Sequence, residues 1–371
     1  MKIISTVSGI IIICLALSAF ETGGNFEIES MGYIDNNNDF DHEILETADI
    51  EIFFPEIAGQ EIKCQFEIFR PLQGLMHDKQ TSIFFKKLYA GFDMDYFQLT
   101  LGRQPVSWAF GSMFNLIDYT PGSIALGEEF NSKYTDAAEL YIPVNWNSGI
   151  ALIASFPGGI ADDMNALKWG IRIRGGIAGY DITASYVDEA DSVFTADSAL
   201  VSISSMLPKK RAAVSFKGDL WDLGIYGSSG YYFDSINSGF FSYTLGADYS
   251  FFMNYTSKVV LQAEYTGIEL TGIDSITKST LLHMDRSDNR LDIISSSINY
   301  PIDQFSSISL FTIISMDDGS VMLSPIYTAL LPLNIDMELF AYVFMGRDST
   351  LFAPGPVMPR CIGNIRLKYQ W

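Results

Sequence analysis

The chain ends in a stretch that alternates between two kinds of residue, Cys361-Ile362-Gly363-Asn364-Ile365-Arg366-Leu367-Lys368-Tyr369-Gln370-Trp371. Odd-numbered positions are apolar or small, and even-numbered positions are polar or charged, with Ile362 as the exception. A period of two predicts a β-strand with one apolar and one wet face. In a water-soluble sandwich the apolar face would cover a core. A terminal Trp also suits a strand that crosses a membrane and ends at the interface.

This ending resembles the closing strand of bacterial outer-membrane β-barrels, whose last strand finishes in an aromatic residue. The resemblance implies that Tyr369 and Trp371 are an assembly signal for the barrel-assembly machinery. An ordinary edge strand of a soluble sheet is the alternative interpretation.

The beginning of the chain has the layout of a signal peptide. Lys2 is followed by an apolar run from Ile10 to Leu17 and then by small residues at Ser18 and Ala19. This run is short for a membrane-spanning helix. We therefore assign 1–21 to a signal peptide and 22–371 to one barrel domain, with an uncleaved anchor as the alternative. Cys14 follows Ile13, where a lipoprotein needs a small residue, so lipidation is disfavoured.

Composition points to the same class of protein. The 371 residues are 14% aromatic and 18% charged, yet no long apolar run follows the leader. Apolar residues spread one in two along many strands fit a barrel, and a large soluble β-protein competes with it. The net charge of −21 argues against nucleic acid as a partner. Cys64 and Cys361 are predicted to lie too far apart around the wall for a disulfide.

Alternating segments recur along the whole chain and number about 18, or 16 if two weak ones are loops. They are 25–34, 44–54, 61–70, 80–92, 96–103, 137–144, 148–156, 167–174, 179–186, 210–217, 221–233, 239–251, 256–268, 291–300, 305–316, 321–331, 335–345 and 361–371. Short and long connections alternate between them, with short exceptions near Asp234 and Asp317. The pattern predicts an all-β, transmembrane, antiparallel up-and-down barrel with both termini in the periplasm. Met337 to Met345 is apolar on both parities, so we expect its lumen face to pack against a loop or plug.

The longest connection, Gln104 to Thr135, follows Arg103 and is rich in apolar residues. Its sequence Gly102-Arg103-Gln104, then Trp108, Gly111, Asn115 and Asp118, is similar to a pattern in porin-like outer-membrane families, including alginate-export-like barrels. Those families usually have Gly after the Trp, where this chain has Ala109. Because so apolar a segment needs a place to pack, we expect it to fold into the lumen and narrow it. Covering the mouth or contacting a second protomer is the alternative.

Charged residues on the wet parity are candidates for the pore lining. Acids of the long connection would face inward bases and create a transverse field that orders polar solutes. The predicted pore-lining residues are Arg103, Asp118, Glu128, Glu129, Arg172, Arg174 and Arg211. The alternative is that Arg172 and Arg174 only pair with Asp181 across their hairpin.

No catalytic or metal-binding pattern stands out. His42, His77 and His283 have no second ligand at metal-binding spacing, and no phosphate loop or nucleophile elbow occurs. We therefore expect no enzyme activity, no metal and no cofactor.

These features predict an outer-membrane channel for passive diffusion of small hydrophilic solutes. Its expected partners are outer-membrane lipid, the assembly machinery and the solutes, and a homo-oligomer is compatible with the sequence. An outer-membrane barrel for polysaccharide export or surface attachment is one alternative, and a secreted soluble β-protein is another.

Overall fold

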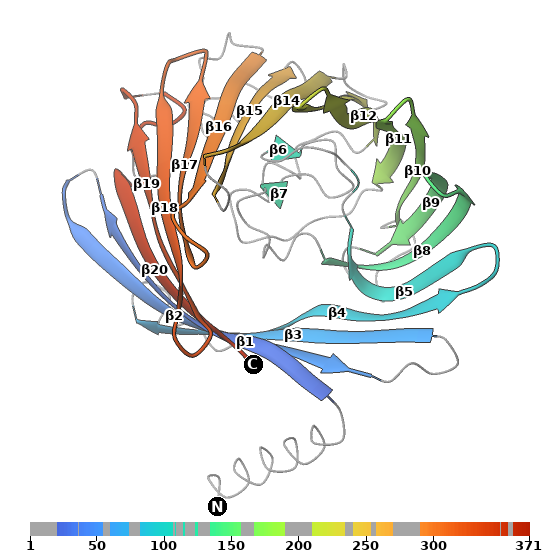
Figure 1. Ribbon diagram of the computed structural model, residues 1–371, viewed down its shortest axis with the longest axis horizontal. Coiled ribbons are helices and arrows are strands. Elements are labelled where there is room, and N and C mark those ends of the chain that lie inside the picture. Colours follow the sequence, from blue (N-terminus) through green and yellow to red (C-terminus); the bar gives the residue numbers. More distant parts are fainter. Residues whose placement is uncertain are drawn as a thin grey trace, which may run out of the picture.

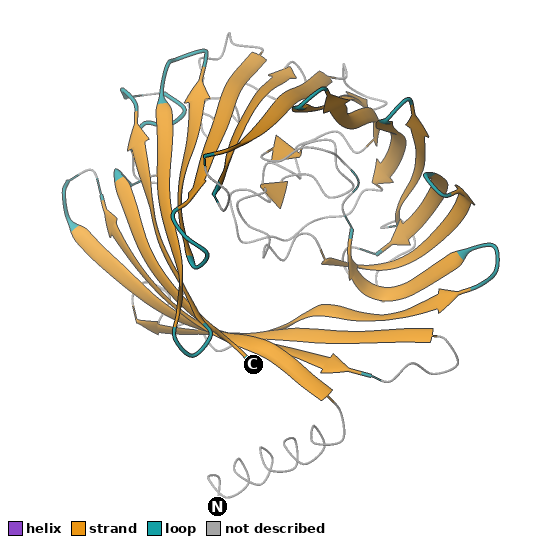
Figure 2. Cartoon of the chain, viewed as in Figure 1, coloured by secondary structure: helices purple, strands orange, loops and turns teal. Residues whose placement is uncertain are grey.

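The computed structural model describes residues 21–35, 37–54, 60–73, 82–106, 108, 114–115, 123–124, 134–156, 167–189, 210–233, 240–253, 257–269, 290–348, 350–354 and 359–371. The predicted signal peptide, except Glu21, lies outside these residues, and so does much of the predicted lumen segment. The described residues are strands joined by turns and loops (Figure 2). They include no helix long and apolar enough to cross a membrane.

Eighteen strands form one sheet, which Figure 1 shows as a ring around an open centre. The first nine are β1 (Glu21–Ile34), β2 (Phe40–Phe53), β3 (Gln60–Gln73), β4 (Ser82–Asp93), β5 (Gln98–Pro105), β8 (Tyr134–Asn145), β9 (Ser148–Ser155), β10 (Lys168–Ile177) and β11 (Tyr180–Glu189). The other nine are β12 (Lys210–Leu220), β13 (Leu223–Phe233), β14 (Phe240–Phe252), β15 (Lys258–Glu269), β16 (Arg290–Pro301), β17 (Ser306–Ser315), β18 (Val321–Leu331), β19 (Ile335–Met345) and β20 (Cys361–Gln370). The predicted strand number is confirmed.

The sheet is closed because the first strand pairs with the last. Consecutive wall strands are antiparallel, and β1 pairs with both β2 and β20. The seam between β1 and β20 is in register from Asn25 opposite Gln370 to Ile34 opposite Cys361. A two-stranded ribbon, β6 (Phe114–Asn115) and β7 (Ser123–Ile124), is drawn in the middle of the ring in Figure 1.

Alternation gives the wall an apolar outer face and a polar inner face. On β20, Ile365, Leu367 and Tyr369 are exposed on the outside, whereas Asn364 is only 5% exposed on the inside. Along the described chain the buried residues include many polar side chains, and the exposed residues include many large apolar ones. This distribution is the reverse of that in a water-soluble protein and suits an outer face covered by hydrocarbon.

Aromatic rings on the outer face gather near both ends of the wall strands. At one end, the ring of Tyr186 lies 5.4 Å from that of Trp169 and 6.1 Å from that of Phe233, and Tyr243 lies 5.8 Å from Tyr265. At the other end, rings pair between Tyr249 and Phe251 and between Tyr369 and Trp371. Such girdles mark the two membrane interfaces of a spanning barrel. The assembly role of Tyr369 and Trp371 stays a prediction.

Short turns lie at the end of the barrel that holds Glu21 and Trp371, for example at 146–147, 178–179, 221–222 and 332–334. The strand ends that flank the longer connections, 106–133, 190–209, 270–289 and 346–360, lie at the opposite end. This alternation is the predicted one, including the short exception at 316–320. By the fold, the short-turn end is the periplasmic one. Strands β1 and β2 separate β20 from β3, and Cys361 and Cys64 are free thiols.

Gly102 in β5 adopts a φ of 123°, and a Cβ atom there would collide with the carbonyl oxygen of Leu88. We predict that Gly102→Ala destabilises the folded barrel by about 1–3 kcal/mol because the side chain meets both strain and backbone. The urea midpoint of unfolding in lipid vesicles measures this loss. Gly363→Ala is the control, since a Cβ atom there meets nothing within 4 Å. Equal midpoints for the two variants would contradict the prediction.

Candidate functional site

The candidate functional site is the lumen, where charges gather on two sides of the wall. The acidic sector consists of inward residues of three neighbouring regions: Glu27 and Glu29 of β1, Asp41, Glu43, Asp49 and Glu51 of β2, and Asp336 and Glu338 of β19. The basic sector consists of inward residues Lys168, Arg172 and Arg174 of β10 and Arg211 and Lys217 of β12, with one inward acid, Asp181 of β11, between them.

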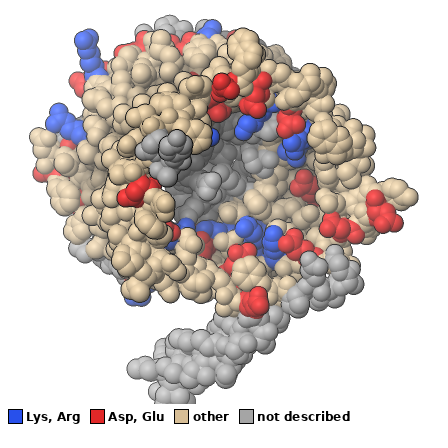
Figure 3. Space-filling model, viewed as in Figure 1, with Lys and Arg blue, Asp and Glu red and all other residues tan. Residues whose placement is uncertain are grey.

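These two sectors face each other across the lumen. In the closed order of 18 strands, β1 and β12 are separated by nine steps in either direction. Lys, Arg, Asp and Glu side chains surround the opening in Figure 3. An excess of acids on one wall and of bases on the opposite wall produces a transverse field in a space whose walls have a low dielectric constant.

Arg366 of the closing strand forms ion pairs with acidic side chains of both neighbouring strands. Its guanidinium lies 3.1 Å from Glu27 and 3.8 Å from Glu29 on β1, and 3.2 Å from Glu338 on β19. It also lies 5.4 Å from the centre of the Phe340 ring. One cation therefore connects the first, last and next-to-last wall strands across the seam.

Lys86 neutralises a second pair of acids in the adjacent wall. Its ammonium lies 2.8 Å from Asp49 and 2.7 Å from Glu67, and its side chain is only 3% exposed. The register between β3 and β4 shifts between Gln65 and Phe66, so that Lys86 is the extra residue of a β-bulge. A bulge breaks the alternation, and here Lys86 and Lys87 both reach the inner side.

The predicted bases have different partners in the structure. Arg174 lies 2.7 Å from Asp181, as the hairpin-pairing alternative proposed. Arg172 lies 5.5 Å from the centre of the Trp108 ring. Arg211 is 1% exposed and stands in register between Val187 and Tyr232.

Arg103 is opposite Leu88 and Asp136 in register, 3.5 Å from the Asp136 carboxylate and 4.7 Å from the centre of the Phe84 ring. The predicted acids Asp118, Glu128 and Glu129 lie outside the described residues. The pore-lining assignment therefore stays a prediction for all seven residues.

The first residues after β5 lie against the inner wall. Val106 and Trp108 are buried in one apolar cluster with Ala137, Ile153 and Val187 of β8, β9 and β11. Gly170 of β10 leaves room for the indole, because a Cβ atom there would approach the Trp108 ring to 2.8 Å. The burial of Trp108 supports the predicted inward course of 104–135, and the course of the remainder stays a prediction.

Three neighbouring strands form an uncharged sector between the two charged ones. Their inward residues are Leu291, Ile293, Ser295, Ser297 and Asn299 of β16, Ser307, Ser309, Phe311, Ile313 and Ser315 of β17, and Met322, Ser324, Ile326, Thr328 and Leu330 of β18. Most of the apolar ones lie toward the long-loop end, hydroxyl groups predominate further down, and Leu330 is apolar at the short-turn end. Phe352, from the connection between β19 and β20, is buried in this apolar part.

Hydrogen bonds fix the segment that carries Phe352. The backbone N–H of Leu351 donates to Asp318 at 2.7 Å, and that of Phe352 donates to Ser320 Oγ at 3.2 Å. Burial alone would raise the pKa of Asp318, but hydrogen bonds from Ser320 and Leu351 lower it overall. Tyr342 and Phe344 pack against the same cluster. The lumen face of 337–345 thus packs against a loop, as the sequence predicted.

Sequence reasoning did not identify the acidic sector. Its signal was present on β2, where Asp41, Glu43, Asp49 and Glu51 share one parity. Closure of the sheet is needed to place these acids opposite β10 and β12. Among the described residues, no group of three or more His, Cys, Asp or Glu side chains is arranged to hold a metal ion.

Comparison with solved structures shows which known proteins have a similar fold. Wzi, an outer-membrane protein involved in group 1 capsule assembly in Escherichia coli and a carbohydrate-binding β-barrel, is similar with a TM-score of 0.58 at 9% identity, over 98% of this chain and 87% of Wzi. OccAB3 of Acinetobacter baumannii is similar with a TM-score of 0.57 at 9% identity, over 95% of this chain and 99% of that one. The chain has the fold of outer-membrane porin-like β-barrels.

A variant of OccD1 (OprD) gives a TM-score of 0.57 at 8% identity, covering 95% of each chain. No protein-family model matches the chain, and no curated protein matches its sequence. At these identities the likeness shows the fold alone. Membership of an alginate-export-like family stays a prediction.

Lys86 provides a test of the buried charges in the wall. We predict that Lys86→Met destabilises the barrel by about 3–5 kcal/mol, because two mostly buried carboxylates lose their counter-charge. Lys63→Met is the matched control, since Lys63 is 40% exposed and pairs with the exposed Glu61; its loss should stay below about 1 kcal/mol. Urea unfolding in lipid vesicles compares the two variants, and a Lys86→Met loss as small as that of the control would refute this assignment.

Proposed function

We propose that this protein is an outer-membrane channel for the passive diffusion of small hydrophilic solutes. The observation that carries the proposal is the facing pair of charged sectors inside a closed wall with an apolar exterior. A barrel of 16 to 18 strands is wide enough to enclose an aqueous path.

The two sectors would act on a solute by orienting its dipole as it passes. Cationic groups move along the side of β1, β2 and β19, and anionic groups move along the side of β10 and β12. The segment that begins with Trp108 would narrow this path from the side of the basic sector. Solutes without charge would pass with less retention.

A second candidate function is polysaccharide export or surface attachment without general pore activity. The likeness to Wzi favours it, since that barrel binds carbohydrate and takes part in capsule assembly. Inward aromatic residues Phe340, Tyr342 and Phe344 on β19 are partly exposed, and sugar rings could stack on the ring surface that their neighbours leave uncovered.

Solute flux separates the two candidates. Proteoliposomes that contain the purified mature barrel should swell in iso-osmotic solutions of small sugars and amino acids, with rates that fall as solute size rises. Protein-free liposomes give the baseline. Swelling no faster than the baseline, with folding verified by heat-modifiable migration on gels, would exclude the diffusion channel and leave the second candidate.

The transverse field makes a separate prediction for ion selectivity. Removing two inward bases with Arg172→Ala and Arg174→Ala should shift the K⁺ over Cl⁻ permeability ratio toward K⁺ by roughly twofold or more. Reversal potentials in a KCl gradient across a planar bilayer measure this ratio. Arg70→Ala is the control, because Arg70 lies on the outer parity and is 62% exposed beside Glu46. An unchanged ratio in the double variant would count against the field.

A further inference from the structure

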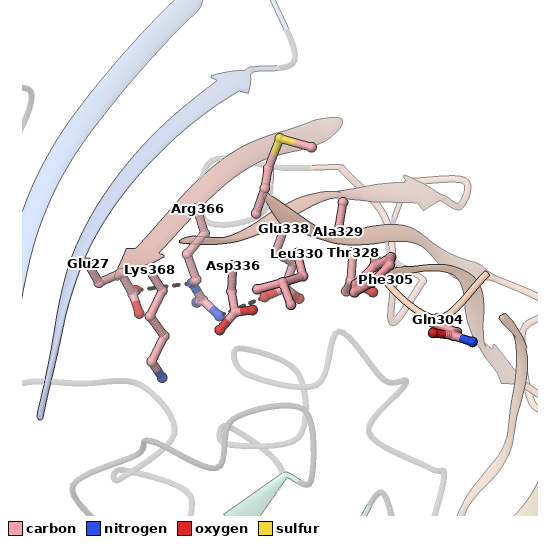
Figure 4. A pocket seen from close by; sticks show the side chains of 11 residues that line it. Glu27, Gln304, Phe305, Thr328, Ala329, Leu330, Asp336, Glu338, Arg366 and Lys368 are labelled. Atoms are coloured by element: carbon pink, nitrogen blue, oxygen red, sulfur yellow. Dashed lines mark hydrogen bonds and ion pairs between the residues drawn. The ribbon is translucent and has the colours of Figure 1, made fainter. Parts of the chain in front are cut away.

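A cavity of about 310 Å³ opens on the lumen near its short-turn end, where β18, β19, β20 and β1 meet the turn between β16 and β17. Figure 4 shows its lining side chains, which include apolar, acidic and basic residues. Phe305 and Leu330 are apolar, Asp336, Glu338 and Glu27 are acidic, and Arg366 and Lys368 are basic.

The apolar part of this cavity is exposed to the lumen. Phe305 is 61% exposed and Leu330 is 43% exposed. Leu330 lies at the short-turn end of the uncharged sector, and Phe305 directly precedes β17 at the same end. The backbone N–H of Leu330 donates to the carbonyl of Phe305 at 2.7 Å. When a ligand covers apolar side chains that face water, the free energy of the system falls, which favours binding.

The acids of the cavity differ in how they are neutralised. Glu27 and Glu338 both contact Arg366, at 3.1 and 3.2 Å. Asp336 stands directly opposite Lys368 in register and accepts a hydrogen bond from Gln370 at 3.1 Å, and no ion pair within 4.0 Å joins it to another described residue. Its carboxylate therefore has room for a ligand's ammonium group, which would compete with the Lys368 ammonium for it. Because Asp336 is directly opposite Leu330 in register, this charge lies beside the exposed apolar wall.

We propose that this cavity is a binding subsite for small organic cations that carry an ammonium group on a short apolar body. The ammonium group would bind Asp336, and the apolar body would cover Leu330 and Phe305. The hydroxyl of Thr328, which is hydrogen-bonded to that of Ser307 at 2.7 Å, lies in the same lining and would accept a further bond from the ammonium group. The proposal rests on the diffusion channel proposed above, which it deepens by naming a preferred class of solute.

Charge and size agree with this class of ligand. Three acids and two bases line the cavity, so its field favours a cation over an anion of the same shape. A volume near 310 Å³ is at the lower end of small-molecule sites and suits a ligand with one ring.

The test uses two probes of similar size and opposite charge, 2-phenylethylammonium and phenylacetate. Each is added to the full mature barrel in a planar bilayer, and the KCl current is recorded against concentration. We expect 2-phenylethylammonium to reduce the current saturably and phenylacetate to have little effect. Methylammonium, which lacks the apolar body, should reduce the current only at higher concentrations. Equal effects of the two ring compounds would overturn the proposal.

Asp336→Asn keeps the shape and the acceptor for Gln370 but removes the charge. It should raise the half-blocking concentration of 2-phenylethylammonium roughly fivefold or more. Asp248→Asn on the inner face of β14 is the matched control and should leave that concentration unchanged. An unchanged value in Asp336→Asn would also overturn the subsite.

A barrel that passes no current would refute the channel without deciding on the cavity. Calorimetric titration of the detergent-folded barrel with 2-phenylethylammonium then decides. Heat of binding that Asp336→Asn abolishes and Asp248→Asn retains would support the subsite, and its absence from the unmodified barrel would refute it.

Discussion

The structure depends on the hydrogen bonds that join its first strand to its last. A backbone N–H or C=O group that faces hydrocarbon without a partner costs several kcal/mol, so an open sheet edge cannot persist there. Pairing of Asn25 to Ile34 with Cys361 to Gln370 removes both edges at once. Because the sheet closes on itself, every wall strand has two neighbours, and alternation then assigns each side chain to lipid or to the lumen.

Because of this division, the unfavourable interactions, which are repulsions between like charges, lie on the inside of the wall. Apolar side chains on the outer face need no partners beyond hydrocarbon, but inward charges lie close together in a confined space. Single cations reduce this repulsion by pairing with more than one acid. Lys86 forms ion pairs with Asp49 and Glu67, and Arg366 forms ion pairs with acids on both neighbouring strands. Asp336 stays outside such groups, and the proposed binding subsite uses it for this reason.

Much of the fold could be predicted from the sequence because its physical signal is local. A period of two in Gly239 to Phe251 or in Cys361 to Trp371 indicates both the strand and its two faces. The same alternation recurs along the chain and predicts the 18 strands of the structure. The inward parity of Arg172 and Arg174 followed from the same alternation.

The arrangement of the lumen could not be predicted in the same way. The acidic sector faces the basic one only because the wall closes with nine steps on either side, which is a property of the whole sheet. The two adjacent lysines at 86 and 87 break the alternation, and only the register with β3 shows that a bulge turns both inward. Likewise, the contact of Trp108 with β10 joins segments about sixty residues apart.

The position of Arg366 also bears on how the wall can deform. This residue ties the last strand to its partners on both sides, at the place where a barrel would otherwise unzip most readily. Peeling β20 away from β1 would separate a guanidinium from its carboxylates in addition to breaking the backbone ladder. Lateral opening of the wall at this seam therefore costs ion pairs as well as backbone hydrogen bonds.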